Sequence, residues 1–234
     1  MPVDILAFDT AAAACSAVLM RNGAILRREW RAMARGHAEA LVPMIECVMR
    51  GETYEALSAI GVTVGPGAYT GLRIGIATAR GLAIATGVPV VGVTSFAVAV
   101  RQVAADLPVD AELLVIALET KRADFYLQAF DRAGAAVAGP QSVLTADIAD
   151  WLPAGVRRIA VAGDAVSRLL PAFPGRLEAA VLEGAALPDA TALAHCVAGR
   201  LIGDGAPPDG TPVRPLYLRP PDATLPSPRR RGHV

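Results

Sequence analysis

The chain has 234 residues, which is long enough for one large domain or two small ones around a buried core. Apolar residues make up 53% of the sequence and charged residues 19%, which excludes an intrinsically disordered chain. Basic and acidic residues number 22 each, so the sequence gives no electrostatic reason to expect strong independent binding to nucleic acid or to an anionic membrane.

The first hundred residues predict the order strand, strand, strand, helix, strand, helix, strand, helix. Asn22-Gly23 predicts a tight hairpin between the second and third strands, because both residues tolerate positive φ. Pro43 lies inside the first predicted helix and predicts a kink or a later start. Thr70 is expected to cap the second helix. The strands are expected at 4–10, 15–21, 24–30, 59–64 and 88–93, and the helices at 37–50 and 70–86, with a third beginning at Thr94-Ser95.

The second half repeats this order. Strands are expected at 112–120, 124–131, 135–143, 159–162 and 179–182, and helices at 145–151, after Asp164 and at 189–202. The first strand of each half also ends alike, in Ala7-Phe8-Asp9-Thr10 and in Ala117-Leu118-Glu119-Thr120. A period of about a hundred residues is typical of duplicated domains and not of a solenoid. We therefore expect two mixed α/β domains, at 1–105 and 106–205, followed by a proline-rich extended segment with a basic tail at 206–234.

One segment requires a check for a membrane span. Residues 81–100 contain no charged side chain and are flanked by Arg80 and Arg101, and twenty such residues can cross a bilayer. Gly87-Val88-Pro89 interrupts the segment, and Thr94-Ser95 is typical of a new helix start. We expect the end of a helix, a buried strand and the start of another helix, and no membrane association.

Three cysteines occur without close spacing, at Cys15, Cys47 and Cys196, which argues against a disulfide framework and against a cysteine-based zinc site. No basic segment precedes an apolar stretch after Met1, so a signal peptide is not expected. Both features favour a cytoplasmic protein with buried thiols. The arginine run at 229–231 is interpreted as a solvated tail, with contact to a nucleic acid as the alternative.

Asp9-Thr10 ends the first strand, where actin-like proteins place their first phosphate loop. A carboxylate there would handle a metal or the attacking group, and glycines would let backbone amides surround a phosphate. Here four alanines follow, from Ala11 to Ala14, and alanine resists the positive φ that such a loop often needs. The pair is interpreted as a degenerate phosphate loop, without nucleotide hydrolysis.

Metal and nucleophile chemistry find little support in the sequence. A histidine site on a helix needs a second ligand three or four residues on, and the corresponding positions after His37 are Ala40 and Leu41. His37 is therefore expected to be a capping or interface residue. No serine or cysteine lies in a nucleophile motif. We predict no catalytic residue, no metal and no cofactor.

The most specific motif is Gly65-Pro66-Gly67-Ala68-Tyr69-Thr70-Gly71-Leu72-Arg73-Ile74-Gly75, a tight turn followed by a helix. The turn could present amides to an anion, or Gly65 and Gly67 could serve only to make the turn. In the helix, small residues recur every four positions in two stripes, one of Gly71, Gly75 and Ala79 and one of Ala77, Gly81 and Ala85. A helix that is apolar nearly all round is usually buried on more than one side. We expect one side to meet a sheet and the other a second helix or a partner protein.

These residues resemble a known family. The motif at 65–75 is similar to the GPGSFTGLRIG signature of the TsaB family, and Asp9-Thr10, the stretch 36–45 and Pro215-Leu216-Tyr217-Leu218-Arg219 fit the same family. The resemblance covers nearly the whole chain up to Arg219. It implies a duplicated actin-like, RNase H-like fold in a bacterial cytoplasmic protein.

The resemblance also implies a function. Members of the TsaB family are non-catalytic subunits of the machinery that attaches threonylcarbamoyl groups to tRNA adenosines. They pair with the catalytic paralogue TsaD through helices of the N-terminal domain, the ATPase TsaE joins the complex, and tRNA is reached through that complex. The interface is expected on the helices at 37–50 and 71–86, at His37, Leu41, Met44, Ile45, Val48, Leu72, Ile76, Ala79 and Ala83.

Three alternatives stay open at this stage. An actin-like ATPase would bind nucleotide through Asp9 and Thr10. A metallopeptidase would need ligands that the sequence does not show. A homodimer could use the same two helices in the absence of TsaD.

Overall fold

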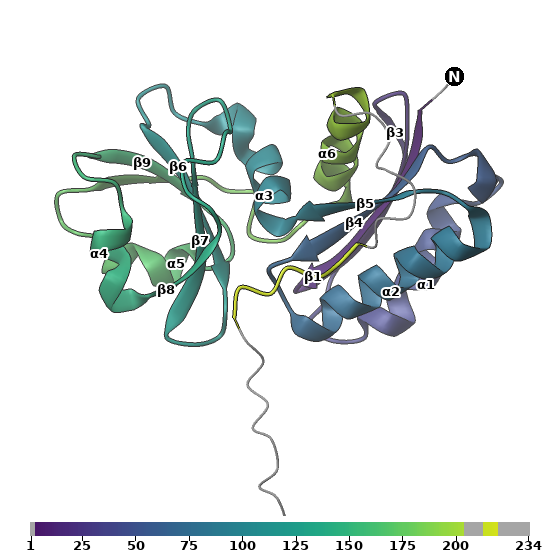
Figure 1. Cartoon of the computed structure of the whole chain (residues 1–234), viewed down its shortest axis with the longest axis horizontal. Helices are drawn as coiled ribbons and strands as arrows, with labels where there is room; N and C mark the ends of the chain where they lie inside the picture. The colour runs from purple at the N-terminus through teal and green to yellow at the C-terminus, as the bar shows by residue number, and fades with distance from the viewer. Residues whose placement is uncertain (1–2, 204–212, 220–234) are drawn as a thin grey trace, which may run out of the picture.

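A computed structural model describes residues 3–203 and 213–219 of the chain. The predicted proline-rich segment at 206–234 is described only at 213–219, and the predicted tail at 229–231 lies outside the described residues. The described chain forms two lobes, each built on a five-stranded mixed sheet (Figure 1). No helix in the described part is both long and apolar enough to cross a membrane.

The first sheet has the strand order β3-β2-β1-β4-β5. Strand β2 is antiparallel to both of its neighbours, β3 and the central β1, whereas β4 and β5 continue from β1 in parallel. Asn22 and Gly23 both have positive φ in the hairpin, as predicted. The strands are β1 (Asp4–Ala12), β2 (Ala14–Arg21), β3 (Ala24–Ala32), β4 (Ala59–Gly65) and β5 (Val90–Thr94).

Side chains alternate between the two faces of β1 and so divide the core of this lobe. Leu6 and Phe8 face helices α1 (His37–Val48) and α2 (Tyr69–Thr86). Ile5 and Ala7 face helix α6 (Ala190–Gly203) on the opposite side. This arrangement buries both faces of the first sheet.

The second sheet has the order β10-β9-β6-β7-β8, which is the same topology as the first sheet. Again three strands are antiparallel and two are parallel, so the predicted duplication is present in the structure. The strands are β6 (Leu113–Glu119), β7 (Asp124–Phe130), β8 (Gln141–Leu144), β9 (Arg158–Ala162) and β10 (Glu178–Val181), with the short helices α4 (Ile148–Trp151) and α5 (Val166–Leu169) against one face. Four 3-10 turns complete the described elements, at Tyr54–Ala56, Ala104–Asp106, Thr145–Asp147 and Leu170–Ala172.

Helix α3 (Ser95–Val103) lies between the two lobes (Figure 1). Thr94 caps it by accepting a hydrogen bond from the Ala97 amide at 3.2 Å, as the sequence predicted. Val98 packs in the core of the first sheet, whereas Phe96 and Val103 pack in a core with the second. The charge-free segment 81–100 thus forms the end of α2, β5 and the start of α3, and Gly87 ends α2 in the left-handed conformation.

Two local expectations were wrong, and so was the later helix start that was one of the two expectations for Pro43. The strand expected at 135–143 is confined to β8, because Asp131 accepts hydrogen bonds from the Ala133 and Ala135 amides in a turn and Pro140 has no amide to donate. Helix α2 begins at Tyr69 with Ala68 at its cap position, so Thr70 does not cap it. Pro43 lies within α1, which begins at His37 all the same.

The predicted division of the chain at residues 105 and 205 stays a prediction, but α6 does not pack with the lobe that it follows in sequence. Its apolar face joins Ile5, Ala7 and Val18 of the first sheet. The Ala190 amide donates to Ser16 Oγ at 3.0 Å, and Asp189 forms an ion pair with Arg28 of β3 at 2.5 Å. Small residues allow the close contact, since a Cβ at Gly61 would lie 2.7 Å from a Val197 methyl group.

Candidate functional site

The end of β1 and the turn after β4 lie in direct contact. The Ala68 amide donates to the Ala11 carbonyl at 2.7 Å, and Thr10 Oγ1 donates to the Gly71 carbonyl at 2.7 Å. A Cβ at Gly67 would lie 2.4 Å from Ala11 O, and one at Gly71 would lie 2.0 Å from Thr10 O. Backbone therefore fills the space in which this turn would have to surround a phosphate.

The rest of the motif has a similar packing role. Gly65 has φ of +107°, a conformation that favours glycine. The Pro66 carbonyl accepts a hydrogen bond from Ser95 Oγ at 2.7 Å, which ties the turn to α3. A Cβ at Gly75 would lie 2.7 Å from Thr10 Oγ1. The signature 65–75 is thus explained by close packing of α2 on the end of β1, without any ligand.

Asp9 is buried inside the first lobe. It is 1% exposed, its Oδ1 accepts from the Ala11 amide at 2.9 Å, and its Oδ2 has no hydrogen-bond partner within the described chain. Burial raises the pKa of Asp9, against the opposing effects of the Thr63 side chain and the Ala11 amide. A buried carboxyl whose ionised form is disfavoured in this way is poorly suited to hold a metal or to activate a nucleophile.

His37 lies at the start of α1, where its Nε2 is 3.0 Å from the carbonyl oxygen of Ala12. Gly36 is the cap residue of the helix and no side chain caps it, so the capping role predicted for His37 is wrong. The imidazole instead joins α1 to the end of β1 and is 9% exposed. Within residues 3–203 and 213–219 there is no group of three His, Cys, Asp or Glu side chains that could hold a metal.

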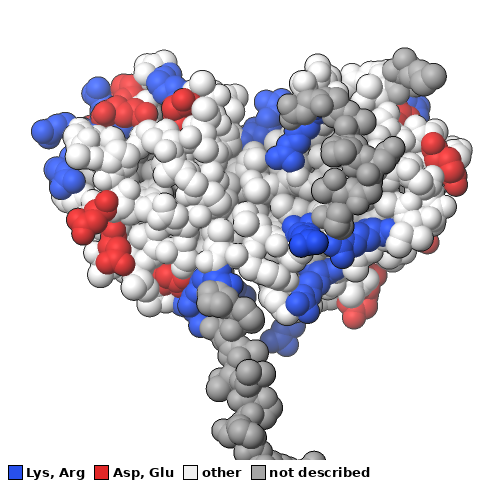
Figure 2. Space-filling model, in the orientation of Figure 1, with Lys and Arg blue, Asp and Glu red and all other residues white. Residues whose placement is uncertain are grey.

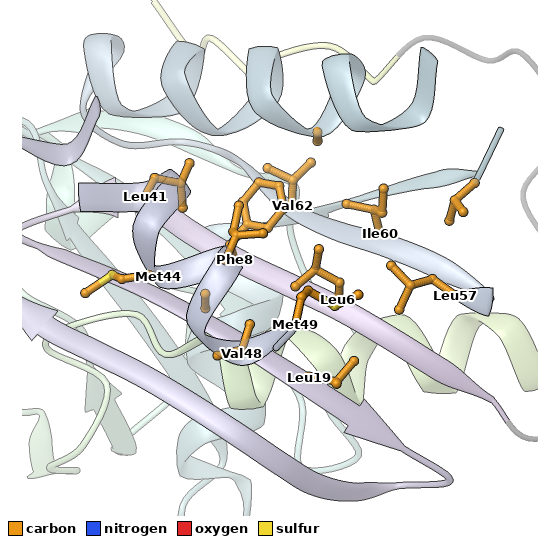
Figure 3. Packing of buried hydrophobic residues seen from close by; sticks show 14 of the residues in the cluster. Leu6, Phe8, Leu19, Leu41, Met44, Val48, Met49, Leu57, Ile60 and Val62 are labelled. Carbon is orange, nitrogen blue, oxygen red and sulfur yellow. The ribbon is translucent and has the colours of Figure 1, made fainter. Parts of the chain in front are cut away.

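Most residues predicted for a partner interface lie in the core of the chain itself. In Figure 3, Leu41 and Val48 of α1 lie beside Phe8 and Leu6 of β1, and Met44 belongs to the same buried cluster. These residues are buried because α1 and α2 pack their most apolar faces against the first sheet. Seven side chains of this set are too deeply buried to touch a partner, since each is at most 5% exposed: Leu41, Met44, Ile45, Val48, Leu72, Ile76 and Ala79. Ala83 is half-buried.

The face of α2 that remains uncovered is the second small-residue stripe. Ala77, Gly81 and Ala85 are exposed, and a Cβ at Gly81 would meet nothing within 4 Å. Ile84 beside them is 88% exposed, and Val42 on the neighbouring α1 is 48% exposed. The repeat of small residues signalled this face in the sequence, although the residues chosen for the interface came from the opposite one.

A cavity of about 1090 Å³ lies between the two lobes. Its lining comes from the turn at 66–71, the start of α1, the end of β6 and the segment 213–219, which we call the C-terminal strap. Strap residue Leu216 donates its amide to Val64 O at 2.7 Å in the first lobe, and Arg219 forms an ion pair with Asp124 at 3.0 Å in the second. Figure 1 shows the strap crossing from one lobe toward the other. The sequence motif 215–219 therefore connects the lobes.

Comparisons with known proteins place the chain. Residues 31–173 match the family model described as TsaD, tRNA N6-adenosine threonylcarbamoyltransferase. The tRNA threonylcarbamoyladenosine biosynthesis protein TsaB of Escherichia coli is 36% identical over 93 residues, which is 39% of this chain and 40% of that protein. The crystal structure described as YeaZ from Pseudomonas aeruginosa superposes with a TM-score of 0.77 at 26% identity, covering 92% of this chain and 100% of that chain. The chain belongs to the TsaB family.

The relation to this family extends over the whole fold. An uncharacterized Mycobacterium tuberculosis protein, Rv3421c, is 32% identical over 223 residues, which is 94% of this chain and 93% of that protein. The alignment with the E. coli TsaB, in contrast, spans less than half of that relative's length. The two mixed sheets and the superposition with YeaZ confirm the predicted duplicated actin-like, RNase H-like fold.

Proposed function

We propose that this chain is a non-catalytic subunit in the formation of threonylcarbamoyladenosine in tRNA, and that it pairs with TsaD through the outer faces of α1 and α2. The E. coli relative's name and the match to the TsaD model support the pathway. In this proposal the protein acts in the cytoplasm, TsaE joins the pair, and tRNA is modified at the TsaD active site.

The observation that best supports pairing with TsaD is the exposed apolar face of α2. Gly81 leaves the helix backbone open to close approach, and Ile84 is almost fully exposed beside it. Apolar surface of this kind on a folded chain marks a contact site. Charged residues border it on both helices, with Glu46 exposed on α1 and Arg80 exposed on α2, as expected for the polar rim of an interface.

The absence of catalysis is supported by the closed first loop. The Ala68 amide is bound to Ala11, and Asp9 is buried with a raised pKa. We infer that the reactive groups are supplied by TsaD. Reconstitution of tRNA modification from TsaD, TsaE and the enzymes that supply the activated group, with and without this chain, tests this inference. Modification by this chain alone would contradict it.

The interface is tested by Gly81→Arg. The substitution has open space within the chain, so the fold should be unaffected, whereas a bulky cation in the close contact should weaken pairing with TsaD at least tenfold. Gly199→Arg is the matched control, because Gly199 is also exposed within a helix with nothing within 4 Å of a Cβ, but lies on α6 on the opposite face of the sheet. If the Gly81→Arg variant binds TsaD with unchanged affinity in a titration, another surface is used for pairing.

Homodimerisation through the same face is a second possibility, favoured by the same exposed stripe. Light scattering of the isolated chain distinguishes the cases: a dimer that Gly81→Arg dissociates and that TsaD displaces would mean that both assemblies share the surface.

A nucleotide-binding role remains the alternative from another class, and the cavity of about 1090 Å³ is the observation that favours it. Calorimetric titration of the isolated chain with ATP decides it. Robust binding that Asp9→Asn abolishes would favour an actin-like ATPase.

A further inference from the structure

The mouth of the cavity between the lobes carries a pair of exposed tyrosines. Tyr69 at the start of α2 is 52% exposed, and Tyr217 of the C-terminal strap is 45% exposed. Their rings are stacked, with centroids 5.6 Å apart and planes at 29°. Two large aromatic side chains have thus been brought together from distant parts of the sequence without being buried.

Arg73 fixes the geometry of the pair. Its guanidinium lies 3.9 Å from the centroid of the Tyr69 ring, and its Nε donates to the Tyr217 hydroxyl at 3.2 Å. The strap is held by the hydrogen bond between Leu216 and Val64. The aromatic surface is therefore rigid before any ligand arrives, which lowers the entropy cost of binding.

The same mouth is locally basic in a chain with no formal net charge. The cavity lining has more cationic than acidic residues. Among these residues, Glu119 is paired with Arg168 at 2.8 Å, burial raises the pKa of Asp164, and Arg219 is itself paired with Asp124 at 3.0 Å. Figure 2 shows basic side chains on both sides of the lower end of the notch between the lobes. The cationic lining residues are Arg35, Arg73, Lys121, Arg122 and Arg219, and the acidic ones are Glu39, Glu119 and Asp164.

We propose that this mouth is a contact surface for single-stranded RNA, in which an unpaired base stacks on the Tyr69–Tyr217 pair and Arg73 and Lys121 bind the flanking phosphates. Stacking platforms bordered by cations are the usual means of holding unpaired nucleotides, because every base has a π face and every linkage a negative charge. The inference rests on the proposed function, since tRNA is the substrate of the complex.

A free mononucleotide fits the surface less well than RNA does. The turn that would have to hold its phosphates has its Ala68 amide bound to Ala11, and backbone occupies the space in front of Gly67 and Gly71. The cations instead lie around the mouth, where they can bind successive phosphates of a chain.

The test uses the complex of this chain with TsaD and measures the affinity for tRNA by fluorescence anisotropy at several salt concentrations. Tyr217→Leu keeps apolar bulk but removes the π face, and it should weaken tRNA binding about tenfold. Arg73→Gln should weaken binding and lower the slope of log affinity against log salt by roughly 0.7, the value for one phosphate of a single strand. Pairing with TsaD should be unchanged in both variants.

Two controls exist elsewhere on the surface. Trp30 on β3 is also an exposed aromatic residue near an arginine, with Arg28 at 6.0 Å, so Trp30→Leu removes a comparable pair away from the cavity. Arg158 on β9 is exposed and its side chain forms a long ion pair with Asp110 at 3.9 Å, so Arg158→Gln removes a charge without touching the mouth. Both controls should bind tRNA as the unmodified complex does.

The outcomes separate the two proposals. Unchanged tRNA affinity in both cavity variants, with TsaD still bound, overturns the RNA surface and leaves the proposed function standing. If the cavity variants lose pairing with TsaD, the mouth is a protein contact, and the RNA surface is overturned. If they lose ATP binding but keep their affinity for tRNA, the mouth is a mononucleotide site, and the RNA surface is overturned as well. If the unmodified chain does not pair with TsaD, the proposed function is wrong, and the same variants titrated with an unstructured oligoribonucleotide decide the inference.

Discussion

The two small-residue stripes of α2 look alike in sequence and have opposite surroundings. Gly71 and Gly75 face inward, where a Cβ would meet Thr10 at 2.0 and 2.7 Å, whereas Gly81 faces outward with nothing within 4 Å of its Cβ position. Thr10 of the chain itself packs against the first stripe, whereas no atom of the described chain lies within 4 Å of a Cβ at Gly81 in the second. A repeat of small residues thus predicts that something approaches closely, but it does not reveal whether the neighbour belongs to the same chain.

The sharpest test of this comparison places a charge on each face. Ile76 is 4% exposed and lies in the core, so Ile76→Asp should lower the free energy of unfolding by about 4 kcal/mol or prevent folding, because the carboxylate would be buried without a partner. Ala77→Asp, one residue away on the exposed face, should change it by less than about 0.5 kcal/mol. Urea denaturation measures both. Equal losses would show that the two faces are wrongly assigned.

A single methyl group gives the next largest effect. Gly71→Ala should destabilise the fold by about 2 to 3 kcal/mol, because the new Cβ would lie 2.0 Å from Thr10 O and α2 would have to move away from β1. Thermal unfolding followed by circular dichroism measures the loss. A variant as stable as the unmodified chain would mean that the close contact between α2 and β1 is not required.

The pH dependence of Asp9 should be of opposite sign to that of a paired carboxylate. Because burial raises its pKa above the ordinary value of 3.8, Asp9 costs stability that is absent below pH 3.8 and grows as pH rises toward the folded-state pKa. Asp9→Asn should therefore stabilise the chain at neutral pH and have no such effect in acid.

Asp189→Asn provides the contrasting case. Although burial opposes it, the hydrogen bond from Arg28 lowers the pKa of Asp189, so its contribution is present above pH 3.8 and is lost as pH falls. This variant should destabilise the chain at neutral pH. Denaturation of both variants at neutral and acidic pH measures the difference, and the same sign for both would contradict the assignment.

The smallest predicted effect is a gain. Gly81→Ala should stabilise the isolated chain by up to about 1 kcal/mol, because alanine is the better helix former and its Cβ has open space. The same change should weaken pairing with TsaD if the backbones approach closely at Gly81. A stabilised variant with unchanged pairing would restrict the proposed contact to other residues of the face.

Much of the fold could be predicted from local sequence. Alternation in β1, the Asn22-Gly23 turn and the Thr94 cap gave most elements of the first lobe to within two residues. The candidate site was harder. Leu41 and Ile76 were predicted for a partner interface, whereas the structure buries both in the core against the first sheet. Hydrophobic periodicity identifies a face that must be covered, and the most apolar face is taken first by the protein's own core.

By itself the sequence determined the duplicated order of elements and the resemblance carried by residues 65–75, because each depends on neighbouring residues or on a short motif. Only the tertiary structure decided that α6 returns to the first sheet, that the end of β1 closes against the turn of α2, and that Tyr69 and Tyr217 meet at the cavity. These contacts join residues far apart in the chain. Local propensity contains no information about such pairs, since their energy appears only when the sheets and helices have packed.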